Sequence, residues 1–258
     1  MVERNNNWDG VTFFHTNESL DAIIAGLIPQ SNDNILAICG SGDQAFALVQ
    51  YGAKVFAVDN IPEQVTYAES RKTALLKEDI TGFLPASYLP ENRIRGAQRI
   101  LIPQIQKVLV PKKIIPHLDG LQFKTGNLFN ELLDNTLEFN KMYLSNSMEY
   151  IHHADGGRVI PRRISFSSEE EQIRLKLILQ RLTLGGLVYF SGPEETYTIY
   201  HARGYPDKVE KELNPELISD LESKLVLVPE LTKKARDYEK KWSTATMWAP
   251  AVYRKQPK

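Results

Sequence analysis

The chain has little cysteine, no long apolar run and almost no net charge, and each absence excludes a class of protein. One cysteine, Cys39, cannot form an intrachain disulfide framework or a cysteine-rich metal site. No run reaches the roughly 20 apolar residues of a membrane span, and the polar start MVERNNNWDG lacks a signal-peptide core. A formal charge of −1 gives no general argument for nucleic acid. We therefore expect a cytoplasmic protein with no nucleic-acid partner.

Apolar runs alternate with segments of helical periodicity along most of the 258 residues. This pattern predicts a single α/β domain, doubly wound around a mostly parallel Rossmann-like sheet. A helix over 17–27 precedes the first strand, and the proline-rich stretch 80–118 predicts an inserted helical cap beside the site. The expected strands are 34–39, 54–59, 121–124, 141–144, 187–190 and 249–254.

The glycine turn after the first strand is the strongest functional signal. Gly40-Ser41-Gly42-Asp43 follows an apolar run, and the next strand ends in Asp59, 19 residues after Gly40. With Ala45 the turn formally satisfies the dinucleotide fingerprint, in which a later acid binds the ribose. There is no Gly-x-x-x-x-Gly-Lys-Ser/Thr motif, so a nucleotide triphosphatase is not expected.

Asp43 bears on which cofactor this turn holds. A carboxylate at the start of the helix would repel a pyrophosphate, which needs a positive helix N-terminus. S-adenosylmethionine has no phosphate and carries an ammonium and a sulfonium, so an acid there is favourable. We therefore expect S-adenosylmethionine. Two alternatives stay open, an NAD-dependent oxidoreductase and a non-catalytic nucleoside-binding module, and Asp43 could simply cap its own helix.

Several segments resemble the class I S-adenosylmethionine-dependent methyltransferase superfamily. The closest likeness is to the S-adenosylmethionine:diacylglycerol 3-amino-3-carboxypropyltransferase family, over roughly 19–71 and 141–192. It is carried by SLDAIIAGL, ILAICGSGDQAFALVQYGAKVFAVDNIPEQVTYAESRKTAL, YLSNSMEYI and LGGLVYFSG. The resemblance implies a transferase that moves a methyl or 3-amino-3-carboxypropyl group to a small or lipid-like acceptor.

The resemblance also implies roles for individual residues in cofactor binding. Gly40, Ser41, Gly42 and Asp43 would surround the amino-acid end of the cofactor, and Asp59 would hold the ribose. The other implied positions are Asn60 and Ile61 beside the adenine, Asn127 and Leu128 near its amino edge, and Ser145 and Asn146 near the sulfonium.

Chemistry is expected just after the fourth strand, where polar side chains cluster. Glu149, Tyr150 and His152 are the candidates for removing a proton or holding the acceptor, with His152 favoured because an imidazole titrates near neutral pH. His152-His153-x-Asp155 lacks an evident third ligand, so no metal site is expected. The basic and apolar stretch 93–113 is typical of a peripheral membrane contact, of an anion clamp or of a packed lid. The sequence leaves the oligomeric state open.

Overall fold

The computed structural model describes residues 10–84, 96–130, 137–145, 176–193, 224–242 and 248–257. The elements are α1 (Leu20–Leu27), β1 (Asn34–Ile38), α2 (Asp43–Val49), β2 (Lys54–Asp59), α3 (Pro62–Leu76), α4 (Ile80–Phe83), α5 (Gly96–Val108), α6 (Pro111–Ile114), the 3-10 helix η3 (Ile115–Gly120), β3 (Leu121–Thr125), β4 (Phe139–Ser145), β5 (Leu182–Pro193), β6 (Leu225–Leu227), α12 (Pro229–Trp242) and β7 (Trp248–Lys255).

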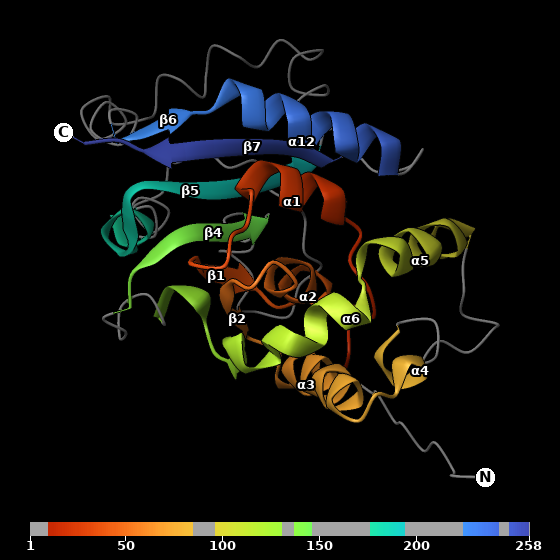
Figure 1. Cartoon of the computed structure of the whole chain (residues 1–258). Coiled ribbons are helices and arrows are strands. Elements are labelled where there is room, and N and C mark those ends of the chain that lie inside the picture. Colours follow the sequence, from red (N-terminus) through yellow and green to blue (C-terminus); the bar gives the residue numbers. More distant parts are fainter. Residues whose placement is uncertain are drawn as a thin grey trace, which may run out of the picture.

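These strands form one seven-stranded sheet in the order β3-β2-β1-β4-β5-β7-β6 (Figure 1). β1 to β5 pair in parallel, and β7 runs antiparallel between β5 and β6. The chain starts in the middle of the sheet, because β1 pairs with β2 on one side and with β4 on the other. This confirms the predicted doubly wound α/β fold. The switch of direction between β1 and β4 is where such sheets bind ligands, at the carboxyl ends of their strands.

Side chains alternate between two apolar clusters on the two faces of the sheet, as strand geometry requires. Ile35 and Ala37 of β1 join the larger cluster, which also holds buried residues of α1, α2, α3 and α12. Leu36 points to the smaller cluster, together with Met142 and Leu144 of β4. α1 and α12 lie side by side over the β5–β7 part of the sheet (Figure 1). The sheet is thus packed on both faces, and the carboxyl ends of its parallel strands lie together at one edge.

Local sequence explains where these helices begin. Ser19 caps α1, because its Oγ accepts a hydrogen bond from the Ala22 N–H at 3.1 Å. Pro62 occupies the first turn of α3, where its missing N–H costs nothing. Because Ser19 is its N-cap, α1 begins at residue 20, three residues later than predicted. Residues 17 and 18 form a bend before the helix, and Glu18 lies against the end of β4.

The described part of the insertion packs differently from the predicted cap. Ile105, Leu109, Ile114 and Leu118 are buried in the larger apolar cluster. η3 leads into the start of β3, so it lies at the amino edge of the sheet. Its His117 lies close to Gly52, which precedes β2: a Cβ on Gly52 would come 3.6 Å from His117 Cε1. Within 96–120 the chain is therefore a core layer, because its apolar residues recur at helical spacing and find a partner face.

The strand expected at 187–190 begins earlier than predicted and contains Gly185 and Gly186. β5 starts at Leu182, and the register with β4 jumps from Phe139–Leu182 to Lys141–Leu187. Gly185 has a φ of +76°, a conformation that glycine adopts without strain. The glycines thus form an irregularity inside the strand. β6 was not predicted, since it has only three residues.

Candidate functional site

The glycine turn joins β1 to α2 in a conformation that depends on glycine. Gly40 and Gly42 have φ values of +47° and +85°, which are costly for residues with a Cβ. A Cβ on Gly42 would also lie 3.1 Å from Ala68 Cβ and from Phe46 Cε2. The turn is closed by a hydrogen bond from the Gly42 N–H to the Cys39 carbonyl at 2.7 Å. Two predicted site residues therefore shape the backbone at the switch point.

Asp43 does not present a free charge to this turn. It is fully buried, and its Oδ1 lies 2.7 Å from Nη2 of Arg71, which is also fully buried. Its Oδ2 accepts hydrogen bonds from the Thr16 N–H and the Ser41 hydroxyl, both at 2.8 Å. The prediction that Asp43 supplies an uncompensated negative charge is therefore wrong, because Arg71 neutralises that charge inside the fold.

Arg71 is the residue that the sequence analysis missed in this part of the site. Besides the ion pair, its Nη1 donates to the Ser41 carbonyl at 2.7 Å and its Nε to the Phe83 carbonyl at 2.8 Å. Its guanidinium lies over the Phe46 and Phe83 rings, 5.2 and 5.1 Å from their centroids. Arg71 thus ties the glycine turn to α3 and α4 and fixes the turn's position.

Asp59 lies at the end of β2, where the sequence predicted a ribose ligand. Its Oδ2 accepts from the Gly40 N–H at 2.9 Å, and its Oδ1 accepts from the Ile61 N–H at 3.1 Å. Burial raises the pKa of this carboxyl above its usual value, while hydrogen bonds from the backbone of Ile61, Gly40 and Asn60 oppose the rise. A carboxylate has about four lone-pair sites, so Asp59 can accept further hydrogen bonds beside these backbone donors. Asn60 is exposed and Ile61 half-buried beside it.

The two residues predicted to contact adenine, Asn127 and Leu128, lie in the turn and short helical segment after β3. Asn127 Oδ1 accepts from the Phe129 N–H at 2.9 Å and the Asn130 N–H at 3.4 Å, so the side chain caps the short helical segment that follows. Leu128 is 8% exposed and belongs to the smaller apolar cluster. The contact of Asn127 and Leu128 with adenine stays a prediction.

A buried acid from the segment before α1, which could not be selected from its sequence context, lies against the end of β4. Ser145 ends the strand with a φ of +48°, a strained value for a residue other than glycine. Its hydroxyl donates to Oε1 of Glu18, and the Tyr143 hydroxyl donates to the same oxygen at 2.9 Å. Glu18 is 2% exposed, and burial raises the pKa of its carboxyl from 4.5 to about 7 against the effect of these hydrogen bonds.

A chain of hydrogen bonds connects this acid to the glycine turn. Gln44 Nε2 lies 3.4 Å from the Tyr143 hydroxyl and donates to Thr16 Oγ1 at 2.9 Å. The Thr16 N–H in turn binds Asp43. The segment before α1 therefore connects the carboxyl ends of β1 and β4 on the face covered by α1 and α2.

Other predicted site residues lie outside the described part of the chain. These are Asn146, Glu149, Tyr150 and His152, together with His153 and Asp155 of the disfavoured metal site. Among the described residues, no group of three or more histidine, cysteine or acidic side chains could hold a metal. No helix in those residues is long and apolar enough to span a membrane. Cys39 is buried, which raises the pKa of its thiol and agrees with the expected packing role.

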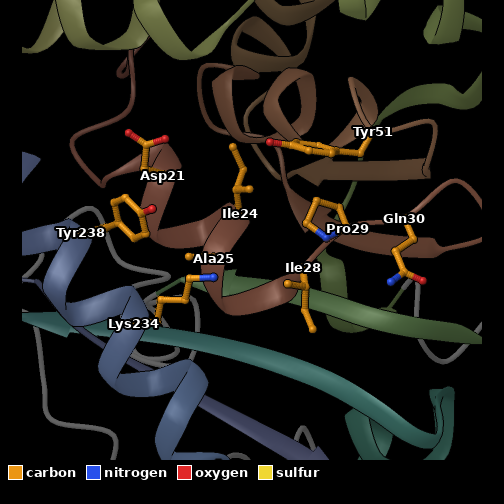
Figure 2. A pocket seen from close by; sticks show the side chains of 9 residues that line it. All are labelled: Asp21, Ile24, Ala25, Ile28, Pro29, Gln30, Tyr51, Lys234 and Tyr238. Atoms are coloured by element: carbon orange, nitrogen blue, oxygen red, sulfur yellow. The ribbon is translucent and has the colours of Figure 1, made fainter.

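A surface groove between α1 and α12 is a separate feature (Figure 2). Figure 2 shows Asp21, Tyr238 and Lys234 at one end and Tyr51, Pro29 and Gln30 toward the other. Pro29 and Gln30 precede β1 and Tyr51 precedes β2, so that end approaches the edge where the strands begin. The groove therefore does not contain the glycine turn, Asp59 or Glu18.

Comparisons with known proteins find similarity in structure alone. No protein-family model matches the chain, and no curated sequence does. Similar solved structures include N-methyltransferase NodS from Bradyrhizobium japonicum WM9, at 11% identity and a TM-score of 0.45, covering 92% of this chain and 93% of that one. The same enzyme has been solved with S-adenosyl-homocysteine.

Two more solved structures are similar over most of their length. A TehB-like SAM-dependent methyltransferase from Corynebacterium glutamicum has 14% identity and a TM-score of 0.43, covering 94% of this chain and 90% of that one. An rRNA methylase from Streptococcus thermophilus has 9% identity and a TM-score of 0.44, covering 93% and 95%. Since so few residues are shared, the activity of this chain must be inferred from its own site.

Proposed function

We propose that this chain is an S-adenosylmethionine-dependent transferase that moves a methyl or 3-amino-3-carboxypropyl group to a small or lipid-like acceptor. The observation that carries the proposal is the placement of Asp59. Its carboxylate ends β2, faces the glycine turn at the switch point of the sheet, and keeps acceptor capacity on both oxygens. This arrangement suits the two hydroxyls of a ribose.

The donors of the turn favour a cofactor without phosphates. A pyrophosphate is normally held by free backbone N–H groups and nearby cations. Here the Gly40 N–H binds Asp59 and the Gly42 N–H binds the Cys39 carbonyl. Arg71, the cation next to the turn, is committed to Asp43. This argument replaces the one from a free Asp43 charge and supports S-adenosylmethionine over NAD.

The chemistry requires little of the protein, because the sulfonium already activates the leaving group. The acceptor's lone pair attacks a carbon bonded to the positive sulfur, the S–C bond breaks, and the electron pair stays on a neutral thioether. The acceptor then loses its proton to a base. The protein aligns the two reactants and excludes water. Under this proposal Glu149, Tyr150 or His152 accepts that proton, and Asn60, Ile61 and Asn146 line the cofactor.

The acceptor proposal rests on the stretch 93–113. Ile102, Ile105 and Leu109 are buried, which favours a packed helix over a membrane-inserting one. Lys107, Lys112 and Lys113 are exposed. They supply positive charge for an anionic headgroup or a small anionic substrate. The group that is transferred can be read from the by-product, which is S-adenosylhomocysteine for methyl transfer and methylthioadenosine for aminocarboxypropyl transfer.

A ligand-dependent thermal shift tests the cofactor assignment. S-adenosylmethionine at 100 times its dissociation constant should add about 2.7 kcal/mol of stability, which is about 5–10 °C in Tm for a chain of this size. Asp59→Ala should abolish the shift, because the ribose loses its acceptor. Asp119→Ala, an exposed acid at the opposite edge of the sheet, should retain it. Stabilisation by NAD and not by S-adenosylmethionine would overturn the proposal.

A further inference from the structure

Two buried carboxylates border the candidate site, and their charges are compensated differently. Asp43 has Arg71, whereas Glu18 receives only hydroxyl hydrogen bonds, from Tyr143 and Ser145, both on Oε1. Among the described residues Glu18 has no salt-bridge partner, and its buried Oε2 has no hydrogen-bond partner. An ionised carboxylate in this position lacks a cation.

Further polar atoms around Glu18 are also unpaired. Gln44 Oε1, Tyr189 Oη and Ser191 Oγ are buried, and none has a hydrogen-bond partner among the residues that the structure describes. The Ser191 hydroxyl lies near the Glu18 carboxyl and, like the hydroxyls of Tyr143 and Ser145, favours its charged form. Buried polar atoms are nearly always paired, so a group of unpaired ones at a sheet edge indicates a missing ligand.

We propose that Glu18 binds the ammonium group at the amino-acid end of the S-adenosylmethionine cofactor, an inference that rests on the proposed function. An ammonium offers three donors and one positive charge. Glu18 Oε2 supplies the charge partner. Gln44 Oε1 supplies a second acceptor, because Gln44 is joined to Glu18 through the Tyr143 hydroxyl.

The location agrees with this assignment. Glu18 is bound to the end of β4 through Ser145, and β4 pairs with β1, whose end carries the glycine turn. The amino-acid end of the cofactor is expected between these two strand ends, while Asp59 at the end of β2 holds the ribose. The cofactor would therefore lie along the sheet edge, with its ribose at the end of β2 and its amino-acid end between β1 and β4.

Binding of a cation by Glu18 depends on pH. Because burial raises the pKa of Glu18 to about 7, the carboxyl is largely protonated below neutral pH and must release that proton when the ammonium arrives. The titratable groups that face it are Tyr143 on β4 and Tyr189 on β5, whose pKa values burial raises further above neutrality. Glu239 on α12 binds the neighbouring Ser19 N–H, and His15 lies on the same segment as Glu18.

Calorimetric titration with three nucleosides tests the assignment. S-adenosylmethionine and S-adenosylhomocysteine carry the ammonium, and methylthioadenosine lacks the whole amino-acid end. At pH 7.5, Glu18→Gln should weaken binding of the first two about tenfold or more, through loss of a charge-assisted hydrogen bond. Binding of methylthioadenosine should stay unchanged. Asp21→Asn removes the same charge from an exposed position three residues away and should alter none of the three affinities.

The pH profile gives a second readout that does not depend on the variant's folding. The wild-type dissociation constant for S-adenosylhomocysteine should rise roughly twentyfold between pH 7.5 and pH 5.5. That of methylthioadenosine should stay flat. A flat profile for both ligands would overturn the inference, as would equal weakening of all three ligands by Glu18→Gln. If the pH dependence of S-adenosylhomocysteine binding is lost in Glu18→Gln, that dependence arises from Glu18 and not from His15. If the wild type bound no S-adenosyl compound, the proposed function itself would fail.

Discussion

The buried pair of Arg71 and Asp43 gives the sharpest test of how this site is held together. Both side chains are 0% exposed, and the closest atoms of the pair lie 2.7 Å apart. The proposed perturbations are Arg71→Met, which keeps much of the length and removes the charge, and Asp43→Asn, which keeps the shape. Each leaves one buried charge without its partner.

Each single variant should lose much of its free energy of unfolding, because the remaining buried charge cannot reach water. Removing one member of a buried pair costs about 3–5 kcal/mol. Arg71→Met also removes the donors to the Ser41 and Phe83 carbonyls and the contact with the aromatic rings, so it should lie at the upper end of that range. In the double variant neither charge remains. Its loss should therefore be smaller than the sum of the single losses, by on the order of 2 kcal/mol.

Urea unfolding of the wild type, both single variants and the double variant measures this coupling. Lys233→Met is the control, since it breaks a pair with Asp237 whose side chains are 78% and 48% exposed. Exposed pairs contribute little, so the midpoint of the control should match that of the wild type. If Arg71→Met cost less than about 1 kcal/mol, or if the single losses simply added, the pair would not hold the turn as we infer.

Two further predictions concern stability. Gly26→Ala should destabilise the protein by about 1–3 kcal/mol, measured by urea unfolding, because the new Cβ would lie 2.8 Å from Tyr189 Cδ2 and 3.0 Å from Val252 Cγ2. Glu18→Gln without ligand should be more stable than the wild type at pH 8 by up to about 3 kcal/mol. Because the folded-state pKa of this acid is raised from 4.5 to about 7, the wild type loses stability as pH rises through that interval. The advantage of the variant should therefore vanish below about pH 4.5, and an equal advantage at every pH would contradict the sign of this reasoning.

The fold and the position of Asp59 could be predicted because their signals are local. An apolar run followed by Gly40-Ser41-Gly42 predicts a strand and a turn whatever the rest of the chain does. Asp59 is the last residue of its own strand, so its position at the sheet edge is fixed by that strand. The parallel pairing then follows from the alternation of strands and helices. The bulge at Gly185 could not be predicted in this way, since it depends on how β5 pairs with β4.

The charge state of the site could not be predicted, because it depends on contacts between distant residues. Asp43 and Arg71 are 28 positions apart, and nothing in the sequence of α3 singles out Arg71 over Lys72, the other basic residue of that helix. Glu18 meets Tyr143 and Ser145 across 125 and 127 positions. A charged residue is expected on the surface by default. The sequence argument therefore assigned the free anion of the site to Asp43, whereas the structure pairs Asp43 with Arg71 and leaves Glu18 without a cation among the described residues.

The cost of keeping a carboxyl at position 18 is itself an argument about its role. A glutamine there has the same shape and can accept the same two hydroxyl hydrogen bonds through its oxygen. It would also avoid the penalty of burying an ionisable group above pH 7. Structure alone therefore favours glutamine at this position. A carboxylate is preferable only when a partner brings a positive charge to it, and the expected S-adenosyl cofactor carries such a charge at its amino-acid end.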